Sequence, residues 1–339
     1  MGDRDLVVIG GSLGAPEAAA TLLAGLPADL PAALLMVITP AGARDAAIFD
    51  RAGPLPAVVA VEGERLRPGR VYVAAPDRHL LVGPDNRVRL SASPHYNRLR
   101  PAVDPLLLSA ARWAGWRTVG VLLSGVFDDG IAGLAALGMH GGLLAVQEPD
   151  DAAYPDLPGT ALRMHPHRVG TAAALAAALP GLLTTPAAPP AEPDPALITE
   201  TDMLIRDNGS PLRDVEVGLP VAVGCPDCGG GLHRVETAHT FRYRCHVGHG
   251  FTADGMLAAQ AQNSETGLLI LASTVCDEAE IYRQLAAQAR TFGEADKADR
   301  YLAAAAAADR AAATVHGLRR DLAAITESAA GAAGSPDSV

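Results

Sequence analysis

The strongest constraint on the fold is an alternation of short apolar runs with helical stretches, which extends from residue 6 to about residue 183. The runs are apolar almost throughout, and several of them end in glycine, as "LVVIGG" and "TVGVLLSG" do. Strands of this kind, separated by helices, are typical of a parallel sheet that is covered on both faces. The sequence therefore predicts an α/β fold with a doubly wound, mostly parallel sheet.

The helices that connect these strands are expected where turn residues meet helical periodicity. They are predicted at residues 15–25, 42–51, 103–114, 130–138 and 172–179. A further segment, "RVYVAAPDRHLLVGPDNRVRLS" at 70–91, has a "GPDN" turn between short β-rich runs. This pattern predicts an antiparallel insertion at one edge of the sheet.

A proline-rich stretch, "TTPAAPPAEPDPA" at 184–196, ends this pattern. It lacks periodicity, so it is predicted to be a stiff, extended linker at a domain boundary. Beyond it lie a cysteine-containing segment and an alanine-rich region that Gly293 divides into two helices, which favours an antiparallel hairpin. The predicted parts are an α/β domain at 1–183, the linker at 184–198, a zinc-ribbon-like module at 199–252, a helical hairpin at 253–327 and a disordered tail at 328–339.

Composition excludes several classes of protein. The chain has 339 residues, enough for two or three domains, and no unbroken apolar run of the roughly 18 residues that a membrane span needs. Its start, "MGDRDLVVIGG", lacks the basic region and long apolar segment of a signal peptide. The net charge of −11 argues against nucleic acid as a partner. These features predict a cytoplasmic protein without membrane insertion.

Two motifs at predicted strand ends carry candidate catalytic residues. "GGSLG" at 10–14 fits the G-x-S-x-G turn that exposes a nucleophilic serine, here Ser12, although a serine that caps a helix would look the same. "SGVFDDG" at 124–130 places Asp128 and Asp129 in a turn, where an aspartate could equally cap a helix. Both motifs lie at carboxyl ends of predicted parallel strands, where open α/β sheets place their sites.

Residues 6 to about 183 resemble the catalytic domain of the chemotaxis protein-glutamate methylesterases, the CheB type. The matching stretches are "VVIGGSLGAPEA", "LRPGRVYVAAPDRHLLV", "RPAVDPLLLSAA" and "GVLLSGVFDDGIAGL", in the order of the family. The resemblance implies a Ser–His–Asp triad that hydrolyses methyl esters on receptor glutamates and deamidates glutamines, with Ser12 as nucleophile and Asp129 as acid. It also implies a methylated, helical, receptor-like protein as partner. The N-terminal receiver domain of regulated members is expected to be absent.

The family's histidine is the main departure from this resemblance. It follows the second strand in a segment like V-Q-H-M-P, and an ungapped alignment places Thr39 there. Threonine cannot accept a proton near neutral pH, so Ser12 would remain a weak alcohol. Three nearby changes accompany it: Leu13 follows the serine, Phe127 lies in the turn before the acid, and "PDLP" at 155–158 replaces G-M-P.

The chain has other histidines that could replace the missing base. His79 matches a histidine that is common in the family at that place, which favours a structural role. His95, in "SPHYNRLRP", is the one candidate that merits a test, because it lies on a loop. His140 is predicted at the opposite end of the sheet from Ser12, and His165 and His167 lie near the end of the domain.

Two hypotheses about function follow. The first is a protein-glutamate methylesterase, with possible glutamine deamidation, whose activity is weak or lost because Thr39 replaces the base. The second is a non-catalytic signalling or scaffold protein that keeps the fold to bind a helical protein partner. Whether the protein serves chemotaxis is left open by its residues.

The segment "GCPDCGGGLHRVETAHTFRYRCHVGHG" has C-x₂-C, sixteen residues, and then C-x₃-H. Cys225, Cys228, Cys245 and His249 form the four-ligand N/S set that structural zinc prefers, with His246 as the rival to His249. His233 and His239 are predicted to be surface residues, and Cys276 a buried apolar position.

This segment resembles a small C-terminal module that is attached to some CheB-like proteins and followed by an alanine-rich helical pair. The resemblance brings no known substrate. A zinc knuckle beside two helices would serve as an interaction platform, and the helices are expected to pair with helices of a partner or of a second copy.

Overall fold

A computed structural model describes residues 4–42, 44–186, 192–205, 218–236 and 241–333, with the side chains of 323 and 325–333 left out. The chain divides into two compact units, Met1–Met256 and Leu257–Val339. The first unit contains the predicted α/β domain and the cysteine-bearing module, and the second contains most of the helical hairpin. His239 lies outside the described residues.

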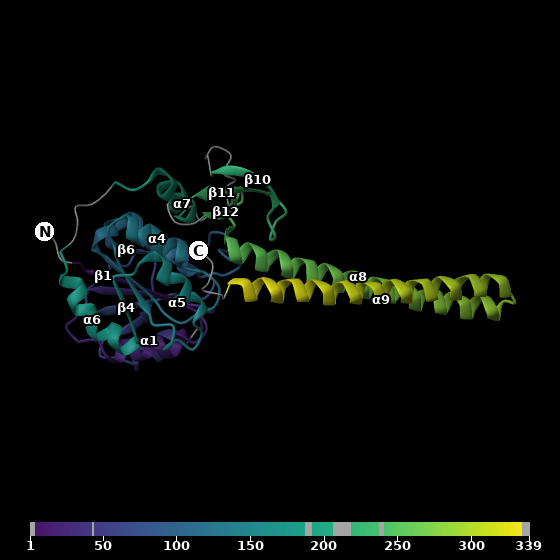
Figure 1. The fold of residues 1–339 in the computed structure, drawn as a ribbon, viewed down its shortest axis with the longest axis horizontal. Helices are drawn as coiled ribbons and strands as arrows, with labels where there is room; N and C mark the ends of the chain where they lie inside the picture. Colours follow the sequence, from purple (N-terminus) through teal and green to yellow (C-terminus); the bar gives the residue numbers. More distant parts are fainter. Residues whose placement is uncertain (1–3, 43, 187–191, 206–217, 237–240, 334–339) are drawn as a thin grey trace. The chain divides into compact units, whose positions relative to one another are not determined.

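A seven-stranded sheet forms the centre of the first unit, and every neighbouring pair of its strands is parallel (Figure 1). In spatial order the strands are β3 (Ala57–Val59), β4 (Arg70–Val73), β2 (Ala33–Ile38), β1 (Leu6–Gly11), β7 (Thr118–Leu122), β8 (Leu143–Gln147) and β9 (Arg168–Gly170). The chain order reverses between β1 and β7, and such a switch point opens a crevice at the carboxyl ends of the strands. The predicted parallel α/β sheet is confirmed.

Helices cover both faces of this sheet, as the continuous apolar strands require. They are α1 (Ala15–Ala24), α2 (Asp45–Asp50), α3 (Val103–Trp113), α4 (Ile131–Met139), α5 (Asp156–Ala161) and α6 (Ala172–Thr184), with single 3₁₀ turns at η1 (Pro84–Asn86), η2 (Gly115–Arg117) and η3 (Leu162–Met164). Alternate side chains of β1 separate the two cores. Val7 and Ile9 pack with α1 and α6, whereas Val8 packs with α3 and α4.

The edge insertion is smaller than the sequence predicts. β5 (His79–Gly83) and β6 (Arg87–Ser91) form the expected antiparallel hairpin, which is a separate two-stranded sheet against α3. "RVYV" instead forms β4, because its buried side chains pair in parallel with both β2 and β3. The sequence patterns predict neither α5 nor β9.

The cysteine-bearing module is a four-stranded antiparallel sheet that follows a short helix. Its strands are β10 (Leu219–Gly224), β11 (Gly231–Glu236), β12 (Phe241–Cys245) and β13 (Gly250–Thr252). The helix α7 (Pro195–Ile205) takes up the last residues of the stretch predicted as a linker. Its Leu197 and Leu204 belong to the same apolar core as α3, so α7 packs on the α/β domain.

Two helices of 39 residues, α8 (Ala253–Thr291) and α9 (Ala295–Ala333), form the predicted hairpin. Their seam includes buried alanines seven residues apart: Ala272, Ala279 and Ala286 on α8, and Ala298, Ala305 and Ala312 on α9. This spacing places the alanines on one face of each helix. Gly293 closes the turn with φ +77°. α9 extends past the predicted end at 327.

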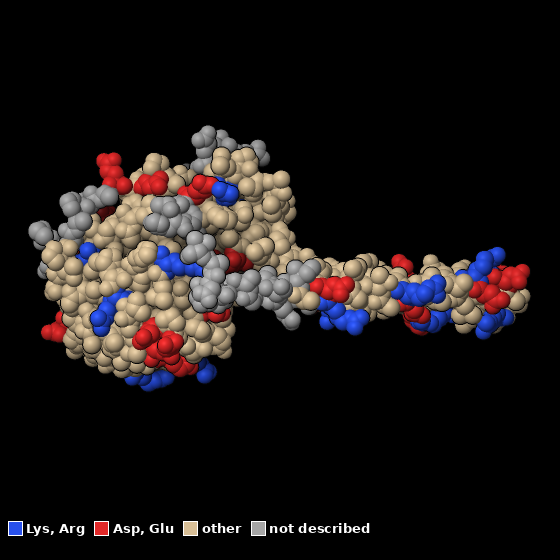
Figure 2. Space-filling view, in the orientation of Figure 1, with Lys and Arg blue, Asp and Glu red and all other residues tan. Residues whose placement is uncertain are grey.

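Two further properties of the hairpin follow from this narrow seam. Cys276 is exposed, so the prediction of a buried cysteine is wrong, because its side chain lies outside the row of alanines. Acidic and basic side chains alternate along the helices in Figure 2, and Arg283 pairs with Asp309 across the hairpin at 2.6 Å. None of the described helices is both long enough and apolar enough to cross a membrane.

Candidate functional site

Ser12 lies in the turn between β1 and α1, against the loop that follows β7. Its amide donates to the Ser124 carbonyl at 3.0 Å, and its Oγ accepts a hydrogen bond from the Val126 amide at 3.1 Å. A Cβ at Gly125 would lie 2.5 Å from Ser12 Oγ, so this close approach requires glycine. The structure thus brings the two predicted motifs together at the switch point of the sheet.

The loop after β7 is held firmly around this contact. The Ser124 amide donates to Gln147 Oε1 at 2.8 Å, and the Ser124 hydroxyl donates to the Leu13 carbonyl at 2.8 Å. Phe127 adopts a left-handed φ of +62° and is 61% exposed, and Leu13 is 44% exposed. Two large, exposed apolar side chains therefore follow the two contacting residues in the sequence: Leu13 follows Ser12, and Phe127 follows Val126.

Asp129 is buried, and both of its oxygens are engaged. Oδ2 accepts from the Val103 amide at 2.8 Å, and Oδ1 accepts from the Asp104 amide at 3.1 Å. These amides are at the start of α3, whose own N-cap, Ala102, has no capping side chain. Asp129 thus caps α3, a helix that precedes it in the chain, which agrees with the alternative that an aspartate of this motif caps a helix. Burial raises the pKa of Asp129 despite the two hydrogen bonds.

Thr39 follows β2 and lies beside the serine turn. Its amide donates to the Gly11 carbonyl at 3.0 Å, and the residue is 2% exposed. Its Oγ1 is buried and has no hydrogen-bond partner among the described residues. A small, uncharged side chain therefore occupies the position where the resemblance places a histidine.

His79 does not face Ser12, and its contacts are structural. Its ring nitrogens contact the Pro94 carbonyl and the Ala102 amide, each at 3.3 Å. Burial lowers the pKa of His79 to about 3, so the ring is neutral at physiological pH. These contacts agree with the structural role predicted for this residue.

His95 lies near the cysteine-bearing module. Its carbonyl accepts from the Gly250 amide, and the charged groups that influence its ring are Arg100, Asp227, His249 and Asp77. Ser12 and Asp129 are not among these groups. No imidazole within the described ranges hydrogen-bonds to Ser12 or Asp129. His140 and His167 also bind main-chain atoms, of Ala136 and Leu144 respectively.

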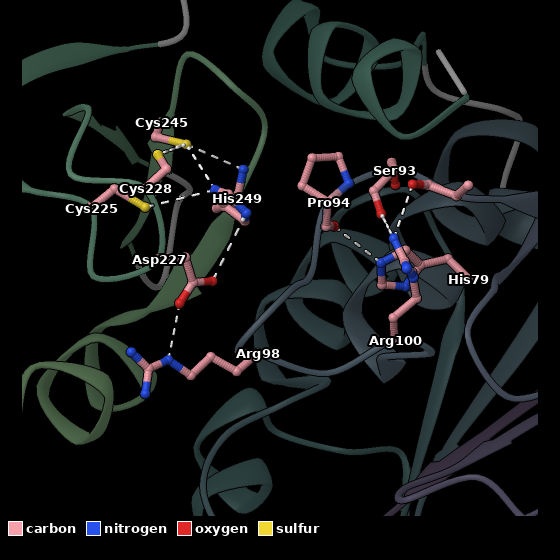
Figure 3. A network of polar contacts seen from close by, with 11 residues as sticks. His79, Ser93, Pro94, Arg98, Arg100, Cys225, Asp227, Cys228, Cys245 and His249 are labelled. Atoms are coloured by element: carbon pink, nitrogen blue, oxygen red, sulfur yellow. Dashed lines mark hydrogen bonds and ion pairs between the residues drawn. The ribbon is translucent and has the colours of Figure 1, made fainter. Parts of the chain in front are cut away.

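Cys225, Cys228, Cys245 and His249 converge in the module, with one ligand atom of each within 4.8 Å of the others (Figure 3). His249 Nδ1 lies 3.8 Å from Cys225 Sγ and 3.4 Å from Cys245 Sγ. The hydrogen bond between Cys225 and Cys245 lowers the pKa of Cys245 and raises the pKa of Cys225, so Cys245 is the first of the two to form a thiolate. Four N/S donors at this spacing are able to hold a metal ion.

Two matching turns of the chain build the cluster. The Gly229 amide donates to the Cys225 carbonyl at 2.8 Å, and the Gly248 amide donates to the Cys245 carbonyl at 2.9 Å. Both glycines have left-handed φ, +71° and +110°. His246 packs against Gly230, where a Cβ would lie 2.5 Å from its ring, so His249 and not His246 enters the cluster.

Sequence reasoning missed the groups that surround the cluster. Asp227 Oδ2 lies 4.0 Å from His249 Nε2, and Asp227 Oδ1 accepts from Arg98 Nε at 3.0 Å. Thr252 Oγ1 donates to Asp128 Oδ1 at 2.5 Å. Asp227 lies within the C-P-D-C motif, so the sequence does indicate that it is near the cluster. Nothing in the sequence links Arg98 or Thr252 to the site.

Comparisons with known proteins show which family residues 7–179 match. Residues 7–179, just over half of the chain, match the family model "CheB methylesterase". The chain is similar to the "protein-glutamate methylesterase/protein-glutamine glutaminase 3" of Anaeromyxobacter dehalogenans, with 42% identity over 161 residues, 46% of this chain and 47% of the relative. It is similar to the protein-glutamate methylesterase/protein-glutamine glutaminase of Photorhabdus laumondii, with 35% identity over 48% of each chain.

A solved structure shares the fold of the same region. The crystal structure of the Thermotoga maritima CheB methylesterase catalytic domain superposes with a TM-score of 0.51 and 28% identity, over 53% of this chain and 100% of that domain. The chain spans about half the length of the curated relatives it matches. The family model, the relatives and the shared fold support one conclusion: the chain belongs to the CheB methylesterase family.

Proposed function

We propose that residues 7–179 form a protein-glutamate methylesterase site of low turnover, with Ser12 as nucleophile and Asp129 as the acid. The relatives' names indicate the substrate class, which is glutamate methyl esters on a protein, with glutamine side chains as a second substrate. The observation that carries the proposal is the contact between Ser12 Oγ and the Val126 amide, at a site where none of the described imidazoles hydrogen-bonds to Ser12 or Asp129.

The low turnover follows from the chemistry of the serine. Its hydroxyl attacks an ester efficiently only when a base removes the proton in the transition state. Loss of the base from a serine triad costs roughly 10⁶ in turnover, or about 8 kcal/mol of barrier. Thr39 has no lone pair of suitable basicity, and its buried Oγ1 is unpartnered.

Restoring the base tests this proposal. Thr39→His should raise hydrolysis of an activated ester such as p-nitrophenyl acetate at least about tenfold, since a positioned general base contributes roughly 10²–10⁴. The same change in a Ser12→Ala background controls for hydrolysis elsewhere on the protein. A gain that persists without Ser12, or no gain with a folded variant, would count against Ser12 as nucleophile.

Labelling by a fluorophosphonate probe supplies a second measurement of the same site. Wild type should label slowly, Thr39→His faster, and Ser12→Ala not at all. Equal labelling of wild type and Ser12→Ala would contradict the assignment.

A non-catalytic binding function is the second candidate, and the exposed apolar side chains of Leu13 and Phe127 favour it. Such side chains beside an idle serine would suit contact with the apolar face of a helical protein partner. If Thr39→His restores no activity, Leu13→Ser with Phe127→Ser should weaken binding of a methylated receptor helix. Unchanged binding would leave this candidate without support.

We also propose that Cys225, Cys228, Cys245 and His249 bind one structural Zn²⁺. A set of three thiolates and one imidazole with no open position is characteristic of structural rather than catalytic zinc. When bound, the ion would cross-link the two turns and supply stability to the module.

Elemental analysis tests the zinc site. The full chain should hold one zinc per molecule, and Cys225→Ser should lose it, whereas the exposed Cys276→Ser should keep it. A folded wild type that binds no zinc when Zn²⁺ is added at neutral pH would refute the site.

A further inference from the structure

The metal-binding cluster has a built second layer of contacts. His249 turns Nδ1 toward the cysteine sulfurs and Nε2 toward Asp227 Oδ2, 4.0 Å away. At 4.0 Å Asp227 is beyond hydrogen-bond distance and acts on the ring by charge, from the side on which a carboxylate orients a metal-bound histidine. The other oxygen of Asp227 accepts from Arg98 Nε at 3.0 Å, so the carboxylate is itself held from outside the module (Figure 3).

Arg98 belongs to the α/β domain, in a segment that the module supports. Asn97 and Arg98 both have left-handed φ, +49° and +61°. Residues other than glycine seldom adopt this conformation, and they keep it where their surroundings hold them. Here the support comes from β13: the Asn97 amide donates to the Gly250 carbonyl, and the Thr252 amide donates to Asn97 Oδ1, each at 2.8 Å.

The same strand reaches the loop that contacts Ser12. Thr252, three residues after the metal-binding His249, donates its hydroxyl to Asp128 Oδ1. Asp128 directly precedes Asp129, and it follows Val126, whose amide binds Ser12 Oγ, by two residues. One short run of the chain, from His249 to Thr252, therefore connects the metal ligands with the predicted catalytic loop.

We propose that metal binding at the cluster positions this loop, and that Asp227 and Arg98 are the positioning residues that couple the two. The inference rests on the proposed metal site. A bound ion holds the ring of His249, and through Asp227 the ring holds Arg98. The strand that follows His249 then keeps Thr252 on Asp128. Neither Asp227 nor Arg98 is a ligand.

The effect of metal removal should be confined to part of the module. Buried Glu200 of α7 pairs with Arg242 and with Arg244 of β12 and accepts from the Tyr96 hydroxyl, and none of these four residues is a metal ligand. These contacts do not involve the cluster, so they keep β12 attached when the ion is absent. Loss of metal should loosen the turns and β13 without releasing the module.

Hydrogen–deuterium exchange on the full chain tests this inference. Removal of Zn²⁺ by a chelator should speed exchange at least about threefold in peptides that cover 95–98 and 126–129, as well as in the cluster. Peptides of β1 and α7 should stay unchanged. A zinc-loaded protein whose exchange at 95–98 and 126–129 does not respond to chelation would overturn the coupling and leave the metal site intact. Absence of zinc in wild type would instead refute the metal site.

Arg98→Gln isolates the positioning role. This variant should still bind one zinc, with an affinity roughly 10–100-fold lower, as for other losses of a second-layer partner. It should also show fast exchange at 126–129 with the metal bound. Asp227→Asn should behave alike and replaces it if Arg98→Gln does not fold. Arg89→Gln, which removes a surface pair with Glu62 in the same domain, is the matched control. Unchanged zinc affinity and exchange in both variants would overturn the role of Asp227 and Arg98.

Discussion

Three aspartates near the start of α3 are buried beside the predicted catalytic loop. Asp104, Asp128 and Asp129 all have a raised pKa, with burial as the largest cause. Asp104 Oδ2 has no hydrogen-bond partner in the described part of the chain, whereas Asp128 accepts a hydrogen bond from Thr252. Burial favours the protonated form of these carboxyl groups. They therefore contribute more to the stability of the fold at low pH than at high pH.

Asp128→Asn should make the free energy of unfolding less sensitive to a rise in pH from about 4 to about 7. The pKa of Asp128 is raised from 3.8 to about 7, so the folded state binds more protons than the unfolded state between these values. The free energy of unfolding therefore falls as pH rises from about 4 to about 7. Asparagine keeps the Oδ1 acceptor for Thr252, and relative to wild type it should gain on the order of 2 kcal/mol between pH 5 and pH 8.

Urea unfolding at the two pH values measures this gain. Asp150→Asn, at an exposed position after β8, is the control for the loss of a surface carboxylate. A gain at Asp128 that is the same at pH 5 and pH 8 would mean that its carboxyl does not titrate in this window.

At the scale of elements, buried charged side chains join α7 to β12. Glu200, Arg242 and Arg244 are nearly fully buried, and two guanidinium groups share one carboxylate. Arg244 also lies over the Tyr96 ring at 5.2 Å. Removal of one member of such a set leaves a buried charge without a partner, which costs more than the pair itself contributes.

Glu200→Gln should therefore destabilise the first unit by roughly 3–5 kcal/mol. Asp202 lies on the same helix as Glu200 and is the half-exposed partner of Arg112. Asp202→Asn should cost less than about 1 kcal/mol. Urea unfolding of the two variants at pH 7 gives the comparison. Similar small losses for both would show that the arginines find other partners or water.

At the scale of the whole molecule, the two units differ in what stabilises them. The first unit has a two-sided sheet with many buried Leu, Val and Ile side chains, whereas the seam of the hairpin is nearly all alanine. Alanine buries little apolar area for each residue, so the hairpin gains less from burial for its length. We expect two unfolding transitions, of which the hairpin's comes first.

Ala279→Leu should lower only the transition of the hairpin. Ala279 is fully buried in the seam, and a larger side chain there forces the helices apart, at a cost of about 1–3 kcal/mol. Ala303→Leu, at an exposed position of α9, is the control and should change little. Scanning calorimetry separates the transitions. A shift of both transitions by Ala279→Leu would mean that the units unfold together.

Local patterns were enough to predict most of the elements. Continuous apolar runs predicted the buried parallel strands. Glycine-rich strand ends placed Ser12 and the Asp128–Asp129 turn at the carboxyl ends of those strands. The C-x₂-C and C-x₃-H spacing predicted the cluster. β4 was misplaced because a short alternating run fits an edge hairpin and a sheet strand equally well, and α5 is a single short helix with a proline inside.

The sequence by itself determined the α/β sheet, the serine and aspartate motifs at its strand ends, the four-ligand spacing and the helical hairpin, because each follows from periodicity or from close spacing along the chain. Only the tertiary structure decided that Asp129 caps α3, that His249 rather than His246 enters the cluster, and that Arg98 and Thr252 link the α/β domain and the module. These contacts join residues up to 129 positions apart. Their partners are selected by packing, which no local pattern of residues records.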